Sequence, residues 1–402
     1  MVGKVNCSEL DCVDGNKIGV VELDNPTSLN ALTLDMLRQL KAKLEKWEDD
    51  ERIVCVFLYG VGEKAFCAGG DVRTMYNMMH DASERQERAS AAKQFLTEYF
   101  TVEYGCDYLI HRYSKPVIVW GEGIIMGGGM GLYMGASHRV TTPTSRLAMP
   151  EISIGLYPDV GGSWFLNKLP DGIGLFLGLT GAQINATDAL ELGMAEHMLM
   201  PEQKQSVLEK LQGSNWGGGI EDTKSHIKNK DITTSSNLAF NNKLVTEVLS
   251  GFADTAEPHR PVSHIRPYFS QIQLACKADD LVDISRQIMS IEGDSRWLER
   301  AKRTLEEGSP ITANICFRQL TQYHHLSLEE CFRLELSLSV HCGLLGEFEE
   351  GVRARLIDKC GQPGWLYKNY SEVDQNVIDS LFTPLWPEHE NPLATLGVKH
   401  QD

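Results

Sequence analysis

Short apolar segments that alternate with helical patterns constrain the fold of this chain more than any other feature. A segment that is apolar at nearly every position is buried on both faces, and such strands are typical of parallel sheets covered by helices. Four segments have strand character: Lys17–Leu23, Ile53–Tyr59, Pro116–Trp120 and His138–Thr142. With helical patterns between them, the alternation predicts an α/β fold with mostly parallel pairing.

The helical patterns rest on apolar residues spaced three and four apart. From Thr33 to about Asp50, leucines and Trp47 recur at that spacing, which marks one buried face, and Thr33 is a suitable N-cap. A long pattern runs from about Ala82 to His111. Further helices are expected at Gly161–Leu169, Gly172–Leu179 and Thr187–Leu192.

The length of 402 residues allows two domains, because a single core stops growing near about 250–300 residues. Near Pro201 the composition changes, and residues 203–264 are polar, with Gly217–Gly219 and Thr233–Ser236 as loop signals. Helical patterns then continue to Leu356. We therefore expect a catalytic core at 1–200 and a mainly helical region at 201–402, in which 203–264 is poorly assigned.

Charge and cysteine usage exclude several classes of function. A net charge of −17 argues against nucleic acid or an anionic membrane as partner, although a local basic patch could bind a phosphorylated ligand. Val117–Ala136 is too rich in glycine for a bilayer helix. The ten cysteines form no C-x-x-C pair and no zinc spacing, so we predict no metal site. Without a recognisable export or transit signal, the expected location is cytoplasmic.

Residues 147–165 contain the most informative polar pair. Glu151 and Asp159 stand in a segment made mainly of apolar residues, glycine and proline. Carboxylates in dry surroundings can perform acid/base or acyl chemistry at neutral pH. Alternatively, the two are surface carboxylates at turns beside prolines.

Two glycine-rich segments precede this pair, Lys64–Arg73 and Gly121–Leu132, with their adjacent glycines at Gly69–Gly70 and Gly127–Gly129. The first joins a strand end to a helix with Asp71 as its N-cap, and the second opens a helix. Glycines there would let backbone N–H groups approach a ligand, or would simply allow a tight turn and close packing. Neither completes G-x-G-x-x-G, and no P-loop or G-x-S-x-G motif occurs, which argues against dinucleotide, P-loop and serine-hydrolase functions.

Taken together, two backbone amides and a nearby carboxylate could form an oxyanion hole with an acid/base group. Such a site suits chemistry that turns a carbonyl, especially a thioester, into an oxyanion or enolate.

At this point the chain resembles the crotonase (enoyl-CoA hydratase/isomerase) superfamily, over about residues 15–200. The resemblance rests on segments in the family's order and spacing: Asn25–Leu32, Ala68–Asp71, Gly127–Gly129, Pro150–Glu151 and Gly161–Gly162. It implies an α/β crotonase-like spiral of ββα units with a C-terminal helical region.

Within that superfamily, Pro150–Gly162 and the segments Phe348–Ala354 and Leu356–Lys359 resemble the 3-hydroxyisobutyryl-CoA hydrolase subgroup. Hydratases of the superfamily carry a second glutamate where this chain has Gly131, and they usually lack an acid at the position of Asp159. The resemblance therefore favours thioester hydrolysis over addition of water to a double bond.

The resemblance also implies roles for individual residues. The amides of Gly70 and Gly128 would hold the thioester oxygen, and Glu151 and Asp159 would be the catalytic carboxylates. Arg73 would contact a CoA phosphate or is simply a surface arginine. The segments expected to hold CoA comprise Ala31, Leu32, Ala68, Gly69, Gly70, Asp71 and Val72. CoA is part of the substrate, so no cofactor is expected, and a homo-oligomer is compatible with the family.

Three functions remain as alternatives. The favoured one is hydrolysis of a short 3-hydroxyacyl-CoA thioester of the 3-hydroxyisobutyryl-CoA type, in valine catabolism. The second is an enoyl-CoA hydratase or isomerase, against which Gly131 argues. The third is a catalytically silent CoA-binding protein, against which the presence of Glu151, Asp159 and both glycine segments argues.

Overall fold

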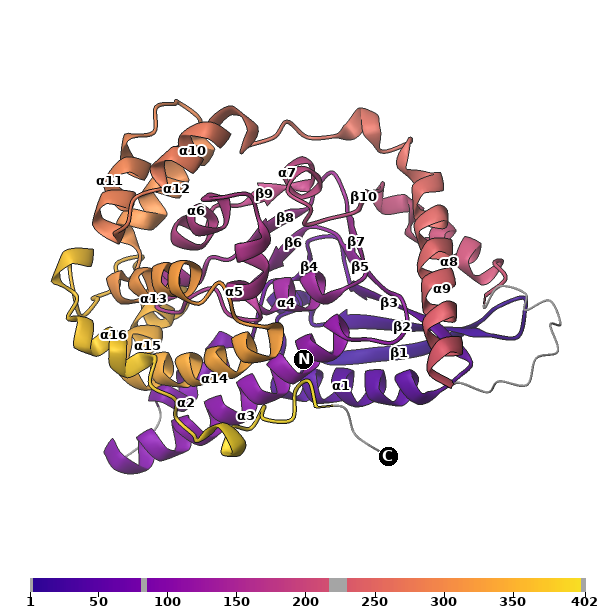
Figure 1. Cartoon of the computed structure of the whole chain (residues 1–402), viewed down its shortest axis with the longest axis horizontal. Coiled ribbons are helices and arrows are strands. Elements are labelled where there is room, and N and C mark those ends of the chain that lie inside the picture. Colours follow the sequence, from indigo (N-terminus) through magenta and orange to yellow (C-terminus); the bar gives the residue numbers. More distant parts are fainter. Residues whose placement is uncertain (1–2, 81–84, 217–229, 399–402) are drawn as a thin grey trace.

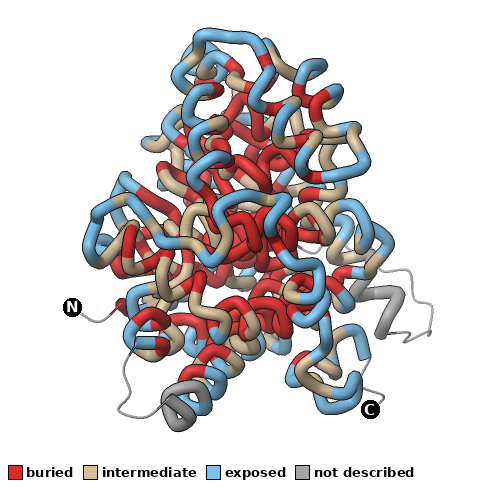
Figure 2. The backbone as a smooth tube through the Cα atoms, turned by 90° about the vertical axis from the view of Figure 1, so that its left-hand side faces the viewer, coloured by how far each residue is buried: buried red, intermediate tan, exposed pale blue. Residues whose placement is uncertain are grey.

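The structure is a computed structural model that describes residues 3–80, 85–216 and 230–398, with side chains described except at 85–89 and 230–236. Two β-sheets and the helices around them make up the architecture (Figure 1). Figure 2 shows buried backbone running through the middle of the molecule, with exposed segments at its outer turns.

The larger sheet has six strands in the order β1-β2-β3-β5-β7-β10. The first two strands are antiparallel, and each following pair is parallel. The strands are β1 (Lys4–Asp11), β2 (Lys17–Asp24), β3 (Ile53–Gly60), β5 (Val117–Gly121), β7 (His138–Thr141) and β10 (His197–Met198).

The smaller sheet has four strands in the order β4-β6-β8-β9. They are β4 (Ala65–Cys67), β6 (Ile124–Met126), β8 (Arg146–Ala148) and β9 (Ile184–Asn185). Three of these follow a strand of the larger sheet directly, so β3–β4, β5–β6 and β7–β8 each run from one sheet to the other and then into helical turns. This arrangement confirms the expected α/β fold with ββα units.

Helices of the first half cover the sheets. They are α1 (Leu34–Asp49), α2 (Val72–His80), α3 (Arg85–His111), α4 (Gly128–Gly135), α5 (Gly162–Phe165), α6 (Ile173–Thr180) and α7 (Ala186–Glu191), with 3₁₀ turns η1 (Pro26–Ser28), η2 (Glu151–Ile154) and η3 (Leu166–Lys168).

Local sequence explains where these helices begin. The Thr33 hydroxyl accepts a hydrogen bond from the Met36 amide at 3.2 Å, which confirms the predicted N-cap of α1. The Asp71 carboxylate likewise accepts from the Thr74 amide at 3.2 Å and caps α2.

The second half is mainly helical. Its helices are α8 (Lys204–Gln212), α9 (Lys230–Ala253), α10 (Phe269–Ala275), α11 (Leu281–Ser290), α12 (Arg296–Glu307), α13 (Pro310–Gln322), α14 (Leu328–Leu345), α15 (Glu347–Val352) and α16 (Gln375–Leu381). Shorter turns are η4 (Pro201–Gln203), η5 (Glu257–His259), η6 (Arg266–Tyr268), the π-helical η7 (Arg353–Ile357), η8 (Tyr370–Glu372) and η9 (Glu388–Glu390).

The helical half does not form a core of its own. Leu96 and Phe100 of α3 belong to the same hydrophobic cluster as Ile272 of α10 and Leu336 of α14. In Figure 1, α14 lies beside α3 across the lower part of the molecule. The division expected at residue 200 therefore stays a prediction, and helices from beyond it complete the packing around the first half.

One expectation in the polar stretch 203–264 is wrong. The sequence predicts a loop at Thr233–Ser236, but these residues lie inside α9. Gly217–Gly219 lies outside the described residues. Burial explains the helix, because Val245 and Leu249 of α9 and Leu208 of α8 pack in a cluster on the larger sheet. A tertiary contact of this kind overrides weak local propensity.

Candidate active site

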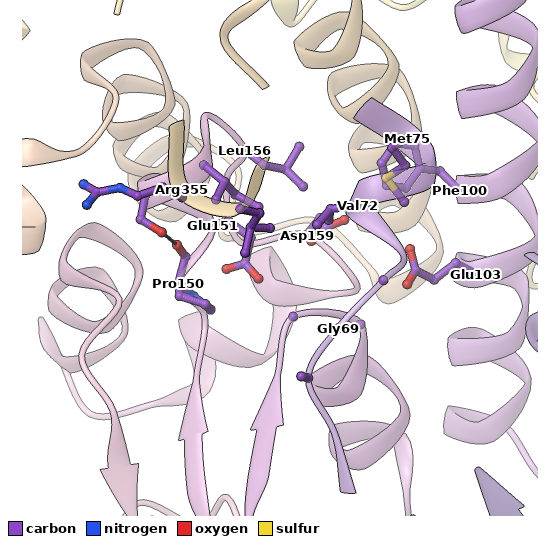
Figure 3. A pocket seen from close by; sticks show the side chains of 17 residues that line it. Gly69, Val72, Met75, Phe100, Glu103, Pro150, Glu151, Leu156, Asp159 and Arg355 are labelled. Atoms are coloured by element: carbon purple, nitrogen blue, oxygen red, sulfur yellow. Dashed lines mark hydrogen bonds between the residues drawn. The ribbon is translucent and has the colours of Figure 1, made fainter. Parts of the chain in front are cut away.

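A cavity of about 290 Å³, here called the Glu151 cavity, opens where several distant parts of the chain meet (Figure 3). Its lining comes from the turn after β4, the start of α4, the segment from η2 to Asp159, and η7. The α3 helix adds one wall through Phe100 and Glu103. Of the predicted site residues, Ala68, Gly69, Gly70, Val72, Gly128, Glu151 and Asp159 line it.

The two glycine segments lie in van der Waals contact. A Cβ atom on Gly69 would stand 3.7 Å from the Gly128 nitrogen, and one on Gly128 would stand 3.4 Å from the Gly70 nitrogen. Gly69 has φ +116° and Gly127 has φ +51°, values that side chains rarely tolerate. The segments, far apart in sequence, thus bring the Gly70 and Gly128 amides to the same end of the cavity.

Neighbouring hydrogen bonds fix these segments but leave both amides unused. The Leu32 amide donates to the Gly69 carbonyl at 2.8 Å, and the Asp71 amide donates to the Leu32 carbonyl at 2.9 Å. Among residues 3–80, 85–216 and 230–398, neither the Gly70 nor the Gly128 N–H donates to another protein group. Both are therefore available to an oxygen atom of a ligand.

Glu151 begins η2 immediately after β8 and is only 4% exposed. Its Oε1 lies 3.1 Å from the position that a Cβ on Gly127 would take, and its Oε2 has no hydrogen-bond partner in the described part of the chain. Burial raises the pKa of Glu151 well above its ordinary value, and the negative charges of Asp159 and Glu103 add to the effect. The carboxyl group therefore enters the cavity with a free oxygen.

Asp159 is oriented from α3 and α14. The Tyr104 hydroxyl donates to its Oδ2 at 2.7 Å and lies 2.6 Å from the Ser339 hydroxyl, which is 2.7 Å from the Tyr157 hydroxyl. Burial raises the pKa of Asp159 to about 6, although the hydrogen bond from Tyr104 opposes the rise. A helix of the C-terminal region thus helps to hold this carboxylate.

The backbone after Asp159 is held in an unusual conformation. Val160 has φ +51°, which is rare for a β-branched residue and stores strain. Glu335 of α14 holds the segment, since its carboxylate accepts from the Gly161 amide at 2.7 Å and the Ser163 amide at 3.1 Å. Burial raises the pKa of Glu335 to about 8. We infer that this anchor sets where the Asp159 side chain points.

Sequence reasoning missed Glu103. This residue lies on α3, and Figure 3 shows its carboxylate directed toward the Gly69 turn. Its Oε1 is 2.4 Å from the position that a Cβ on Gly128 would take and lacks a described hydrogen-bond partner. Burial, and secondly the charge of Asp159, raises the pKa of Glu103.

Asp107, one helical turn beyond Glu103, was also missed. Both of its carboxylate oxygens are buried without a partner in the described chain. Acids spaced four apart among the aromatic residues of one helix face would have been the signal for this pair.

Asp107 also explains the absence of a side chain at Gly131. A Cβ on Gly131 would stand 2.6–2.8 Å from the Asp107 carboxylate, closer than atoms can approach. The position at which hydratases of the superfamily are expected to carry a glutamate is therefore filled, in this chain, by an acid from α3.

The remaining predicted CoA-binding residues, Ala31, Leu32, Asp71 and Arg73, are not among those that line the cavity. Leu32 is buried and pairs with Gly70 in an isolated parallel bridge, and Ala31 precedes it half-buried. Arg73 is exposed and donates to the Leu356 carbonyl at 2.8 Å, which ties α2 to η7. CoA binding by these residues stays a prediction.

In the described part of the chain, no helix combines the length and apolar composition needed to cross a bilayer. Val117–Ala136 in particular forms β5, β6 and α4.

Comparison with solved structures agrees with the fold. An enoyl-CoA hydratase from Rhodobacter sphaeroides matches with a TM-score of 0.74 and 26% identity, covering 94% of this chain and 97% of that one. A carnitinyl-CoA dehydratase from Mycobacterium thermoresistibile matches with a TM-score of 0.76 and 27% identity, covering 95% and 97%.

Sequence comparison is more specific. The family model for enoyl-CoA hydratase/isomerase matches residues 18–382. Mitochondrial 3-hydroxyisobutyryl-CoA hydrolases are similar to nearly the whole chain: the Danio rerio protein is 34% identical over 92% of this chain and 88% of its own length, and the Bos taurus protein is 35% identical over 91% and 86%. The chain therefore belongs to the enoyl-CoA hydratase/isomerase family, in the branch that includes the 3-hydroxyisobutyryl-CoA hydrolases.

Proposed function

We propose that this chain hydrolyses a short 3-hydroxyacyl-CoA thioester, of the 3-hydroxyisobutyryl-CoA type, with two backbone amides as oxyanion hole and Glu151 and Asp159 as catalytic carboxylates. The observation that carries the proposal is the convergence of the unused Gly70 and Gly128 amides beside the free oxygen of Glu151. The names of the relatives support the substrate class.

In the proposed reaction, the thioester oxygen accepts hydrogen bonds from the Gly70 and Gly128 amides. Charge that develops on this oxygen is stabilised where it forms, and each such donor is worth about 10²–10³ in rate. Glu151 then acts in one of two ways. As general base it takes a proton from water, which attacks the carbonyl carbon; as nucleophile it attacks that carbon itself and forms a mixed anhydride that water cleaves.

Asp159 is proposed to orient the substrate hydroxyl or the attacking water, and to help protonate the departing thiolate. Its hydrogen bond from Tyr104 keeps one oxygen occupied and leaves the other for substrate. A carboxyl group with a pKa near the working pH can both accept and return a proton.

Release of free thiol from a panel of acyl-CoAs tests the function. Turnover should be greatest with 3-hydroxyisobutyryl- or 3-hydroxypropionyl-CoA, and crotonyl-CoA followed in the ultraviolet should show little hydration. Hydration of crotonyl-CoA without thiol release would contradict the proposal and indicate that the protein is a hydratase. Tight CoA binding without any turnover would replace it with a silent binding protein.

The two routes are separated by single turnover in ¹⁸O-labelled water. Label recovered in a peptide containing Glu151 supports the anhydride, because water then attacks a carbonyl that includes a Glu151 oxygen. Label found only in the acyl product supports the general base.

Compartment, cofactor need and assembly remain part of the proposal. We expect no cofactor besides the CoA of the substrate, and a role in valine catabolism follows from the substrate proposed. The names of the relatives assign those proteins to mitochondria, so cell fractionation should compare that location with the cytoplasmic one. Sedimentation of the purified chain would test for a homo-oligomer.

A further inference from the structure

A second cavity, of about 440 Å³, lies along α12 and shares Pro150, Ser153 and Arg355 with the Glu151 cavity. We call it the α12 cavity. Figure 3 shows the Arg355 side chain directed away from the Glu151 carboxylate. The two cavities are thus neighbours on opposite sides of a common wall, and nothing in the proposed chemistry uses the second one.

The α12 cavity concentrates positive charge. Arg296, Arg300 and Arg303 are spaced four and three apart, so they share one face of α12, and all three line the cavity. Arg355 adds a fourth guanidinium, and Glu307 is the single acidic residue among the described lining residues. In a chain with a net charge of −17, this local excess of arginine is the opposite of the average surface.

The three arginines of α12 also lack protein partners. Several other arginines in the described ranges pair with acids, such as Arg286 with Asp283 and Arg318 with Asp379. Arg296, Arg300 and Arg303 form no ion pair with any described residue, whereas Arg355 donates to Glu307 at 3.1 Å. Unpaired like charges on one helix face repel one another, so an anion that binds between them would relieve that repulsion.

Aromatic rings complete the lining. Trp297 and His264 both line the cavity, and their rings stack with an interplanar angle of 8°. The Trp297 indole N–H donates to the Gln183 carbonyl at 2.6 Å, which fixes the ring. A fixed aromatic pair beside guanidinium groups suits a ligand with both a flat ring and phosphate groups, because arginine matches phosphate oxygens in a bidentate fork.

We propose that the α12 cavity binds phosphate groups of a nucleotide-like ligand. Two sources share this chemistry: the phosphate-bearing nucleotide end of the acyl-CoA substrate, and a separate small nucleotide or inorganic phosphate. The first source rests on the proposed function, and the second does not. For the first, the nucleotide end would pass the shared wall at Arg355 and reach α12, instead of lying at Asp71–Arg73 as the family resemblance implies.

The test uses the full chain with Arg300→Glu and Arg303→Glu combined. Lys46→Glu with Lys277→Glu is the matched control, because both lysines are exposed, lie outside the cavity and give the same change in net charge. Far-UV circular dichroism and thermal melting check that both variants fold. Rates are measured with 3-hydroxyisobutyryl-CoA and with the same acyl group on pantetheine, which lacks the phosphates.

If the substrate is the source, the arginine variant should raise KM for the CoA thioester about tenfold with kcat unchanged, and should leave the pantetheine thioester unaffected. If a separate ligand is the source, both KM values stay constant, but calorimetric binding of ADP or inorganic phosphate to the wild type is lost in the arginine variant. The proposal is overturned if neither change occurs, or if the lysine control shows the same loss. If no acyl-CoA is hydrolysed, calorimetry still measures whether ADP or 3′,5′-ADP binds to the α12 cavity, so failure of the proposed function does not remove this test.

Discussion

The Glu151 cavity and the α12 cavity share Pro150, Ser153 and Arg355, but their ionisable groups differ in sign and in burial. In the first, carboxyl groups are buried, lack full hydrogen bonding and have raised pKa values. In the second, the guanidinium groups of Arg296, Arg300 and Arg303 lie at exposed positions on one face of α12. We therefore expect the first cavity to respond to pH, because its acids are buried, and the second to respond to salt, because its arginines are exposed.

The difference also concerns rigidity. The donors expected to act in the Glu151 cavity are backbone amides fixed by strand and helix geometry, which cannot move without unfolding the segment. Those of the α12 cavity lie at the ends of long side chains. We therefore expect substitutions in the first cavity to affect mainly kcat and those in the second to affect mainly KM.

The largest expected effect is that of Glu151→Gln. The variant keeps the size of the side chain but cannot accept a proton or form an anhydride, so kcat should fall by about 10²–10⁴. Binding of CoA, measured by calorimetry, should persist. Glu388→Gln, at an exposed position outside both cavities, is the control. Near-normal turnover by Glu151→Gln would remove this residue from the mechanism.

Gly128→Ala should follow, with a loss of about 10²–10³ in kcat. The added methyl group would stand 2.4 Å from Glu103 Oε1 and 3.4 Å from the Gly70 nitrogen, and would obstruct the space between the amides. Gly251→Ala is matched to it, because a Cβ there meets no atom within 4 Å. Equal kcat values for the Gly128→Ala and Gly251→Ala variants would show that the Gly128 amide is not an oxyanion donor.

The pH profile should distinguish the buried acids. Since burial raises the pKa of Asp159 to about 6 and that of Glu151 as well, these groups hold protons at low pH, and kcat should rise with pH. Below the apparent pKa, the fall should be about tenfold per pH unit. Asp159→Asn removes a negative charge that raises the pKa of Glu151, so the rise of kcat with pH should shift to lower pH in this variant. A flat profile from about pH 5 to about pH 8 would contradict a buried carboxylate base.

Gly131→Ala should reduce stability more than activity. Its Cβ would overlap the Asp107 carboxylate, which is short and enclosed, so the free energy of unfolding should fall by about 1–3 kcal/mol. Combining it with Asp107→Ala should restore part of the loss, and a double-mutant cycle from denaturant melts measures the coupling. Independent, additive effects would show that the two residues do not compete for space.

The smallest effect is expected from salt. Raising ionic strength from about 0.05 M to about 0.5 M shortens the screening length, so KM for the CoA thioester should rise a few-fold while kcat changes little. In the Arg300→Glu, Arg303→Glu variant this salt dependence should largely disappear. An unchanged salt response in that variant would separate the α12 arginines from substrate binding.

Much of the fold could be predicted because it depends on local patterns. β3 and β5 are apolar at almost every position, and the leucine spacing of α1 defines its buried face. The α9 helix could not be predicted from its polar start, since its burial depends on a sheet face formed by residues far away in sequence.

The sequence by itself determined the α/β alternation, the two glycine turns and the presence of Glu151 and Asp159 in an apolar segment, because each of these is a property of neighbouring residues. Only the tertiary structure decided that Glu103 lines the same cavity and that Asp107 is buried one turn beyond it. It also decided that Tyr104, itself hydrogen-bonded to Ser339, donates to Asp159, and that arginines of α12 line a cavity together with Arg355. The physical reason is that pKa values and binding depend on distance and burial, which a linear order of residues does not contain.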